Sequence, residues 1–158
     1  LVRAWAYIRT LGESGVKAMT QKAILNANYL KKKIEDVYDI PFSDGILHEF
    51  VASGSRQKKK GTKVLDIAKS LLDYGHHAPT IYFPINIPEA LMMEPTESET
   101  METLDEYANA LIEIDKKITK SPESLIEAPK NTPVKRLNET KANRELNLKY
   151  NYEIQDRQ

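Results

Sequence analysis

The stretch that decides the fold is residues 71–98, LLDYGHHAPTIYFPINIPEALMMEPTES. It opens on the end of an apolar helix, for which Thr62 is the predicted N-cap and Gly75 the predicted stop. Two short apolar runs follow at residues 82–87 and 90–93, with two residues between them. Runs of this length and spacing predict two antiparallel strands joined as a hairpin.

Helical and extended patterns also mark the sequence before this stretch. A long amphipathic helix is predicted over residues 16–38, and residues 12–15, GESG, separate it from a shorter helical pattern at the start of the chain. The chain begins in the middle of that shorter pattern without an initiator Met, which predicts a truncated protein. The apolar run 46–53 predicts a strand, and the basic run 56–61 predicts an exposed loop.

The sequence after the stretch returns to helical spacing. Thr96 and Glu99 have the spacing of a capping box, which predicts the start of a helix that reaches Ile118. Ser121 and Pro122 predict a further short turn of helix. Apolar residues become sparse from residue 130 onward, so the tail is predicted to lie on another surface or to be disordered.

Together these patterns predict an α+β fold. Its short antiparallel sheet of about three strands is expected to carry helices on one face, with a long N-terminal helix leading in. Residues 1–129 are expected to form one small domain and residues 130–158 an extended C-terminal arm.

Composition excludes several classes of protein. The chain has 158 residues, of which 23 are Lys or Arg and 23 are Asp or Glu, so no net charge attracts it to nucleic acid or to an anionic membrane. No apolar run approaches the length of a spanning helix. The absence of cysteine excludes disulfides and thiolate catalysis. These features predict a cytoplasmic protein that binds neither nucleic acid nor membranes.

The chemistry-bearing residues do not form a self-contained active site. A divalent metal could be held by His48, His77 and Glu94, but no H-E-x-x-H or similar ligand spacing supports that interpretation, and packed or hydrogen-bonded histidines are favoured. Nucleophile elbows and glycine-rich phosphate loops are absent from the sequence. No catalytic, cofactor-binding or metal-binding residue is therefore predicted within this chain.

Several separate motifs nevertheless resemble one enzyme family. They are Ala6-Tyr7-Ile8-Arg9, residues 23–30 (AILNANYL), His48-Glu49-Phe50, Leu72-Asp73-Tyr74-Gly75, His77-Ala78-Pro79-Thr80 and residues 93–99 (MEPTESE). In this order they resemble the C-terminal part of the glycine-cleavage P protein, the decarboxylating glycine dehydrogenase. Residues 131–137 and 144–150 are similar to the end of subunit 2 of its two-subunit bacterial form. His76 departs from the family pattern, in which phenylalanine is more typical.

The resemblance implies the small C-terminal domain of a fold type I enzyme that uses pyridoxal phosphate. Such an enzyme releases CO2 from glycine and transfers the aminomethyl group to the lipoyl arm of the H protein. Its partners would be glycine dehydrogenase subunit 1, in a heterotetramer, and the lipoylated H protein. The family's cofactor lysine follows a histidine and precedes a glycine-rich run, and no such motif occurs here, so the fragment is expected to bind no pyridoxal phosphate and to be inactive alone.

The expected role of this chain is to cover the cofactor and line the path of the substrates. The residues expected to do so are Tyr74, His77, Pro79, Thr80, His48 and Glu94. His77 is expected to donate a hydrogen bond to the glycine carboxylate or to a lipoyl sulfur. Two alternatives stay open: a docking module without catalytic function for a partner subunit or carrier protein, and the metal site described above.

Overall fold

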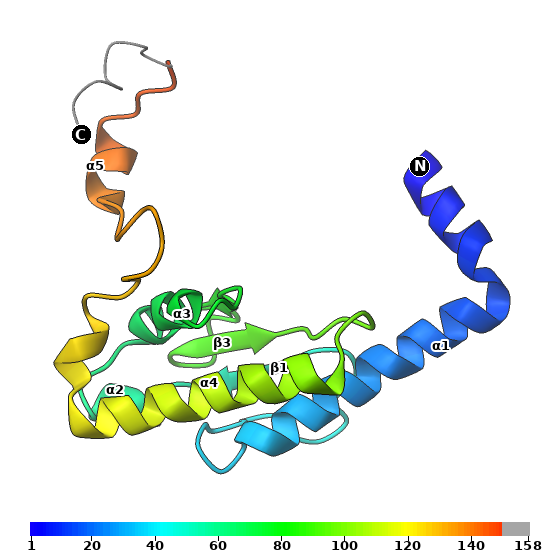
Figure 1. Cartoon of the computed structure of the whole chain (residues 1–158), viewed down its shortest axis with the longest axis horizontal. Helices are drawn as coiled ribbons and strands as arrows, with labels where there is room; N and C mark the ends of the chain where they lie inside the picture. Colours follow the sequence, from blue (N-terminus) through cyan, green and yellow to red (C-terminus); the bar gives the residue numbers. More distant parts are fainter. Residues whose placement is uncertain (150–158) are drawn as a thin grey trace.

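The computed structural model describes residues 1–149 and has helices and a small sheet (Figure 1). No helix within these residues is long and apolar enough to cross a membrane. The elements in chain order are α1 (Val2–Ile34), β1 (Phe50–Ser53), α2 (Ser55–Lys59), α3 (Val64–Asp73), β2 (Thr80–Ile81), β3 (Ala90–Met93), α4 (Met101–Lys120), the 3-10 helix η1 (Pro122–Leu125) and α5 (Glu139–Arg144).

The sheet has three antiparallel strands in the order β1-β3-β2. Phe50 pairs with Met93 and Ala52 with Leu91, so these four side chains share one face of the sheet. All four are buried in the hydrophobic core beneath the helices, whereas Met92 points to the other face and is half-buried. The predicted α+β fold, with helices on one face of a short antiparallel sheet, is confirmed.

Helices α1 and α4 pack against each other and supply much of the core (Figure 1). Leu104, Leu111 and Ile118 recur at helical spacing on α4, and all three are buried. Tyr38, just after α1, is fully buried and its hydroxyl donates to the carbonyl oxygen of Leu111 at 3.1 Å. This burial raises the pKa of Tyr38, so the side chain stays neutral and behaves as a core residue.

Helix α1 bends sharply at Gly12, and the segment before the bend points away from the rest of the molecule (Figure 1). Gly12 has φ 64° and ψ −175°, a conformation that glycine adopts without a steric penalty. The predicted interruption at residues 12–15 is therefore confirmed. The predicted end at residue 38 is four residues too late, because the chain leaves the helix after Ile34 and turns Tyr38 into the core.

Two strand predictions are wrong in their bounds. The first strand is only Phe50–Ser53 instead of residues 46–53. The run 82–87 is not a strand, because β2 ends at Ile81 and Tyr82 has φ 60°. Phe83 and Ile85 are exposed in the connection to β3, which is longer than a hairpin turn. This run is therefore apolar without being a strand: it forms a loop in which Phe83 and Ile85 are exposed.

The basic run 56–61 is also not a loop. Residues Ser55–Lys59 form the short helix α2, because Gln57 is fully buried and ties this segment to its neighbours. The Gln57 amide nitrogen donates to the carbonyl oxygen of Val37 at 3.1 Å and to Asp115 Oδ1 at 2.7 Å. The lysines of the run remain exposed, as expected.

Both predicted helix caps are displaced along the sequence. Helix α3 begins after Lys63, whose backbone N–H donates to the Asp66 carboxylate at 3.1 Å, while Thr62 is buried. Helix α4 begins after Thr100, whose hydroxyl oxygen accepts from the N–H of Thr103 at 3.2 Å. The predicted cap residue Thr96 instead bonds to Ser98 in the preceding loop. The stop of α3 at Gly75, with φ 79°, agrees with the prediction.

The segment after η1 is fixed at its start and exposed beyond. The Asp73 carboxylate accepts from the backbone N–H of Lys130 and of Asn131, and Arg136 pairs with the buried Asp66 at 2.8 Å. Helix α5 has no buried residue. Residues 150–158, which the sequence assigns to the arm, lie outside the described residues.

Candidate functional site

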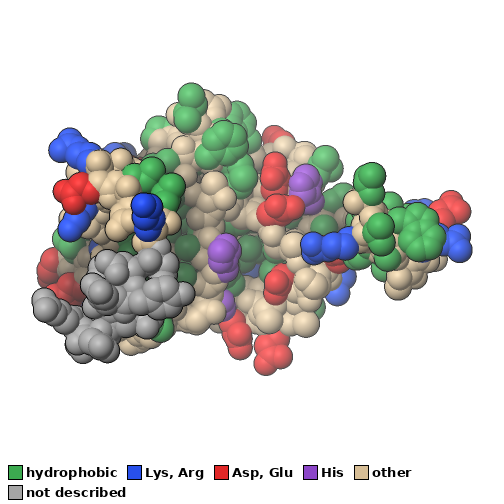
Figure 2. All heavy atoms as spheres, turned by 90° about the horizontal axis from the view of Figure 1, so that it is seen from above, with side chains coloured by type: hydrophobic (Ala, Val, Ile, Leu, Met, Phe, Trp, Pro, Cys, Tyr) green, Lys and Arg blue, Asp and Glu red, His purple; other side chains and the backbone are tan. Residues whose placement is uncertain are grey.

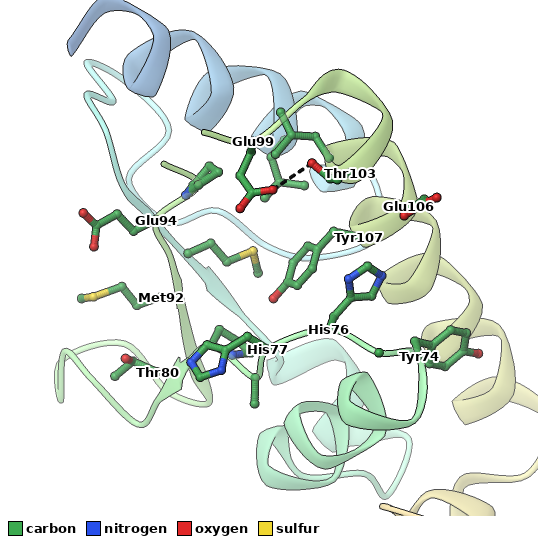
Figure 3. Close-up of a pocket in the computed structure, with 17 residues that line it drawn as sticks. Tyr74, His76, His77, Thr80, Met92, Glu94, Glu99, Thr103, Glu106 and Tyr107 are labelled. Carbon is green, nitrogen blue, oxygen red and sulfur yellow. Dashed lines mark hydrogen bonds between the residues drawn. The ribbon is translucent and has the colours of Figure 1, made fainter. Parts of the chain in front are cut away.

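A cavity of about 650 Å³ lies between the end of α3, the sheet and the start of α4 (Figure 3). One side is formed by residues 74–80, here called the histidine wall. The other side is formed by residues of the segment 92–107, here called the glutamate wall, and Leu30 of α1 contributes as well. The glutamate wall consists of Met92, Met93, Glu94, Pro95, Glu99, Thr103, Leu104, Glu106 and Tyr107.

Five of the six residues predicted to line a substrate path do line this cavity. Four lie on the histidine wall, and Glu94 lies on the glutamate wall, where its exposed carboxylate points outward (Figure 3). His48 is exposed and does not line the cavity. The four on the histidine wall are Tyr74, His77, Pro79 and Thr80.

The same placement bears on the metal alternative. His48 does not join His77 and Glu94 at the cavity. Among residues 1–149, no group of three or more histidine and acidic side chains is arranged to hold a metal ion. The metal interpretation is therefore not supported.

The histidine wall is built from the end of a buried helix. Leu71 is fully buried, and its carbonyl oxygen accepts the backbone N–H of His76 at 3.0 Å. Gly75 has φ 79°, which lets the chain reverse between these two residues. Pro79 disfavours helical geometry at Ala78, so the wall continues directly into β2.

His76 belongs to the histidine wall, and its ring contacts the ring of Tyr107 on α4. The two rings are 5.2 Å apart between centroids and meet edge to face at 73°. Burial raises the pKa of Tyr107, so its hydroxyl stays protonated. Tyr107 was not among the candidate site residues predicted from the sequence. Its position could have been inferred from the helix spacing. Tyr107 follows Leu104 by three residues, so the two side chains lie on the same side of α4, and both line the cavity.

The glutamate wall supplies most of the charge of the site. Glu94, Glu99 and Glu106 line the cavity, and no lysine or arginine within residues 1–149 does. Glu99 Oε2 accepts a hydrogen bond from the Thr103 hydroxyl at 2.8 Å (Figure 3). Imidazole and carboxylate side chains in one cavity can donate and accept hydrogen bonds to a polar ligand. The methionine and proline side chains that line the cavity are apolar and can contact the hydrocarbon part of a ligand.

Exposed segments flank one face of the molecule. Seen from above, the molecule shows histidine and acidic side chains between the projecting start of α1 at the right and the C-terminal segment at the left (Figure 2). Trp5 and Ile8 on the projecting start of α1 are more than half exposed. This face therefore combines charged and apolar side chains.

Comparison with protein families gives one match that covers most of the chain. The model of the family described as "Glycine dehydrogenase, C-terminal domain" matches residues 19–137. These residues include both walls of the cavity and all the strands.

Curated relatives point to the same family. A protein of Bacillus velezensis named "Probable glycine dehydrogenase (decarboxylating) subunit 2" is 53% identical over 149 residues, which are 94% of this chain and 30% of the relative. Proteins of the same name from Listeria innocua and Prosthecochloris aestuarii are 51% and 54% identical, over 97% and 94% of this chain and 31% of each relative. The chain thus spans about 30% of the length of these relatives.

A solved structure shares the fold. It is the crystal structure of glycine decarboxylase (P-protein) of the glycine cleavage system in inhibitor-bound form, with a TM-score of 0.56 and 20% sequence identity. The match covers 68% of this chain and 24% of that chain. At this identity the likeness shows the fold alone.

Proposed function

The chain belongs to the family of glycine dehydrogenase C-terminal domains, and from this premise we propose that it serves as that domain in a pyridoxal-phosphate-dependent glycine decarboxylase. The whole enzyme would release CO2 from glycine and transfer the aminomethyl group to the lipoyl arm of the H protein. The observation that carries the proposal is the cavity, because five residues chosen from family motifs converge on it. We propose residues 1–129 as the domain and residues 130–158 as its arm.

The cavity residues do not fit pyridoxal phosphate itself. An aldimine needs a lysine, and the phosphate needs cationic or backbone N–H donors. In the part of the chain that the structure describes, the side chains that line the cavity include three carboxylates and neither lysine nor arginine. The carboxylates would repel the phosphate. The cofactor is therefore proposed to be held by the remaining part of the enzyme.

The contribution of this chain would be to enclose and position the substrates. A cavity with mixed apolar and polar lining can admit the hydrocarbon part of a lipoyl arm while its polar groups orient the reacting end. Closing such a site against the rest of the enzyme excludes water. His77 is proposed to donate a hydrogen bond to the glycine carboxylate or to a lipoyl sulfur, and Glu94 lies on the other wall of the cavity.

A docking role for the C-terminal segment is a second proposal, favoured by its exposed leucines. Leu137, Leu146 and Leu148 are 65%, 71% and 84% exposed, and nothing within residues 1–149 covers them. Subunit 1 of the two-subunit enzyme is the partner that the relatives' names imply. We also propose that the enzyme works in the cytoplasm, since a chain without cysteine suits reducing conditions.

Replacement of His77 tests the proposed function. In the complete two-subunit enzyme, His77→Ala should lower the rate of glycine-dependent aminomethyl transfer to lipoylated H protein by roughly 10- to 100-fold, a typical range for a positioned polar group. His48→Ala is the matched control, because His48 is equally exposed but lies outside the cavity. Circular dichroism should show both variants folded. Equal rates for the wild type and His77→Ala would contradict a role for the cavity in the reaction.

A further inference from the structure

Asn26 is a polar residue buried on α1. Its side chain is 6% exposed, and its neighbours Ala27 and Leu30 belong to the hydrophobic core. A buried amide costs free energy unless its polar atoms are hydrogen-bonded. The partners of Asn26 therefore indicate what this residue holds in place.

Both partners are backbone carbonyl groups in the segment 92–107, which carries the glutamate wall. Asn26 Nδ2 donates to the carbonyl oxygen of Thr96 at 2.8 Å and to that of Glu99 at 3.3 Å. An amide nitrogen carries two hydrogens, so one side chain supplies both bonds. The two carbonyl groups lie in the loop 94–100, which connects β3 to α4 and carries Glu94 and Glu99 into the cavity.

Leu30 reinforces this link between α1 and the cavity. It follows Asn26 by four residues and so lies on the same face of the helix. Leu30 itself lines the cavity and is 2% exposed. The face of α1 that holds the loop therefore also forms part of the cavity lining.

A second and weaker hydrogen bond joins the same loop to the part of α1 that precedes the bend at Gly12. The Tyr7 hydroxyl donates to Glu97 Oε1 at 2.6 Å, and this bond lowers the pKa of the Glu97 carboxyl. Both side chains lie at the surface, where solvent competes for the bond. In the sequence, Glu97 lies between Thr96 and Glu99, the two residues whose carbonyl groups accept from Asn26.

From these contacts we propose that Asn26 is a positioning residue, which fixes the glutamate wall and so sets where Glu94 and Glu99 stand in the cavity. The inference rests on the proposed function of that cavity. Asn26 touches no reacting group and acts through the backbone of the loop. Loss of its bonds leaves the cavity in place but lets the loop move, which should weaken binding more than it slows the reaction step.

The test uses the complete two-subunit enzyme with Asn26→Leu, which is close in size but has no donor. Amide hydrogen exchange at residues 96–99 should rise about 5-fold, the equivalent of one typical hydrogen bond. The KM for lipoylated H protein should rise about 3-fold or more, with kcat within about 2-fold of the wild type. Tyr7→Phe removes the surface bond to Glu97 together with the contact of the same hydroxyl with Met19 Sδ at 3.2 Å, and it should raise the exchange about 2-fold.

Asn28→Leu is the matched control on the same helix. Asn28 Nδ2 donates to the carbonyl oxygens of Ile24 at 2.9 Å and Ile46 at 3.1 Å, so it holds a different loop. Its replacement should leave the exchange at residues 96–99 and the KM for lipoylated H protein unchanged.

The two readouts separate failure of the inference from failure of the proposed function. Unchanged exchange at residues 96–99 in Asn26→Leu would overturn the positioning role. If Asn26→Leu proves too unstable to purify, Asn26→Ala, which also lacks the donor, takes its place in the same measurement. Raised exchange with unchanged kinetics, together with a silent His77→Ala, would overturn the proposed function of the cavity and with it the role of Asn26 in the reaction.

Discussion

The two walls of the cavity are held in place by different kinds of interaction. The histidine wall continues directly from α3, whose residue Leu71 is fully buried, and it turns at Gly75 with a backbone hydrogen bond. In the glutamate wall, Met93 and Leu104 are buried in the core, but the loop 94–100 between them is held by polar side chains, namely Asn26 of α1 and the cap formed by Thr100. Apolar burial and a glycine turn therefore hold the histidine wall, whereas individual hydrogen bonds hold this loop of the glutamate wall.

This difference teaches which wall tolerates change. Apolar burial is contributed by many contacts at once, so the histidine wall should fail only when the core itself is damaged. A wall held by a few hydrogen bonds can loosen locally while the core stays intact. We expect the glutamate wall to be the adjustable side of the cavity.

The largest expected effect comes from breaking the support of the histidine wall. Leu71→Ala removes a fully buried side chain and should lower the free energy of unfolding by about 2–5 kcal/mol, because a cavity is left in the core. Urea unfolding measures this loss. Leu25→Ala is the control, since Leu25 is 67% exposed and its loss should change stability by less than about 0.5 kcal/mol. Equal effects of the two changes would contradict support by core burial.

A smaller effect is expected from the cap of the glutamate wall. Thr100→Ala removes the acceptor for the N–H of Thr103 and should cost about 1 kcal/mol in the free energy of unfolding. Thr100→Ser keeps the hydroxyl and should retain most of the stability. Urea midpoints of the three proteins provide the measurement. A loss in Thr100→Ser as large as in Thr100→Ala would show that the methyl group, not the cap, matters.

The smallest effect concerns Glu89, which links the elements behind both walls. Glu89 precedes β3 and is 7% exposed. Its Oε2 accepts from the N–H of Val64, the first residue of α3, at 2.8 Å, and its Oε1 accepts from Lys58 Nζ at 2.6 Å. Burial by itself raises the pKa of the Glu89 carboxyl, but these two donors outweigh it and hold the pKa below its ordinary value.

The sign of the resulting pH dependence follows from that lowered pKa. A carboxyl whose pKa is lower in the folded state contributes stability above its unfolded pKa of about 4.3, and the contribution is lost as pH falls further through the folded value. Glu89→Gln keeps an oxygen for the N–H of Val64 but does not titrate. The wild type should therefore lose more of its urea midpoint between pH 7 and pH 3 than Glu89→Gln does.

Glu113→Gln is the control for this pH effect. Glu113 pairs with Lys116 at 2.6 Å on the surface, where solvent screens the pair. Its replacement should leave the pH dependence of the wild type almost unchanged. If Glu89→Gln also retains the full pH dependence, Glu89 does not contribute through its charge.

Sequence patterns predicted the helices better than the strands. Helices α3 and α4 were found because their apolar residues recur at helical spacing over two or more turns. The run 82–87 was mistaken for a strand because it is apolar, yet Ile85 is 92% exposed. Apolar character alone does not indicate burial in a segment of six residues.

The cavity was predicted unevenly, in line with the difference between its walls. Tyr74, His77 and Thr80 lie within the seven residues 74–80, and a local turn brings them to one side of the cavity. Tyr107 was missed because its place at the cavity depends on how α4 packs. Asn26 was missed as a functional residue because its partners lie about 70 residues further along the chain.

The sequence by itself determined the α+β fold class, the long helices α1, α3 and α4, the turn at Gly75 and the family, because these depend on local periodicity, backbone preference and family motifs. Only the tertiary structure decided that Glu94 and Glu99 line the same cavity as the histidines, that His48 lies outside it, and that Asn26 holds the loop 94–100. The physical reason is that hydrogen bonds and ring contacts between distant segments form only after helices and sheet have packed. No local pattern encodes their partners.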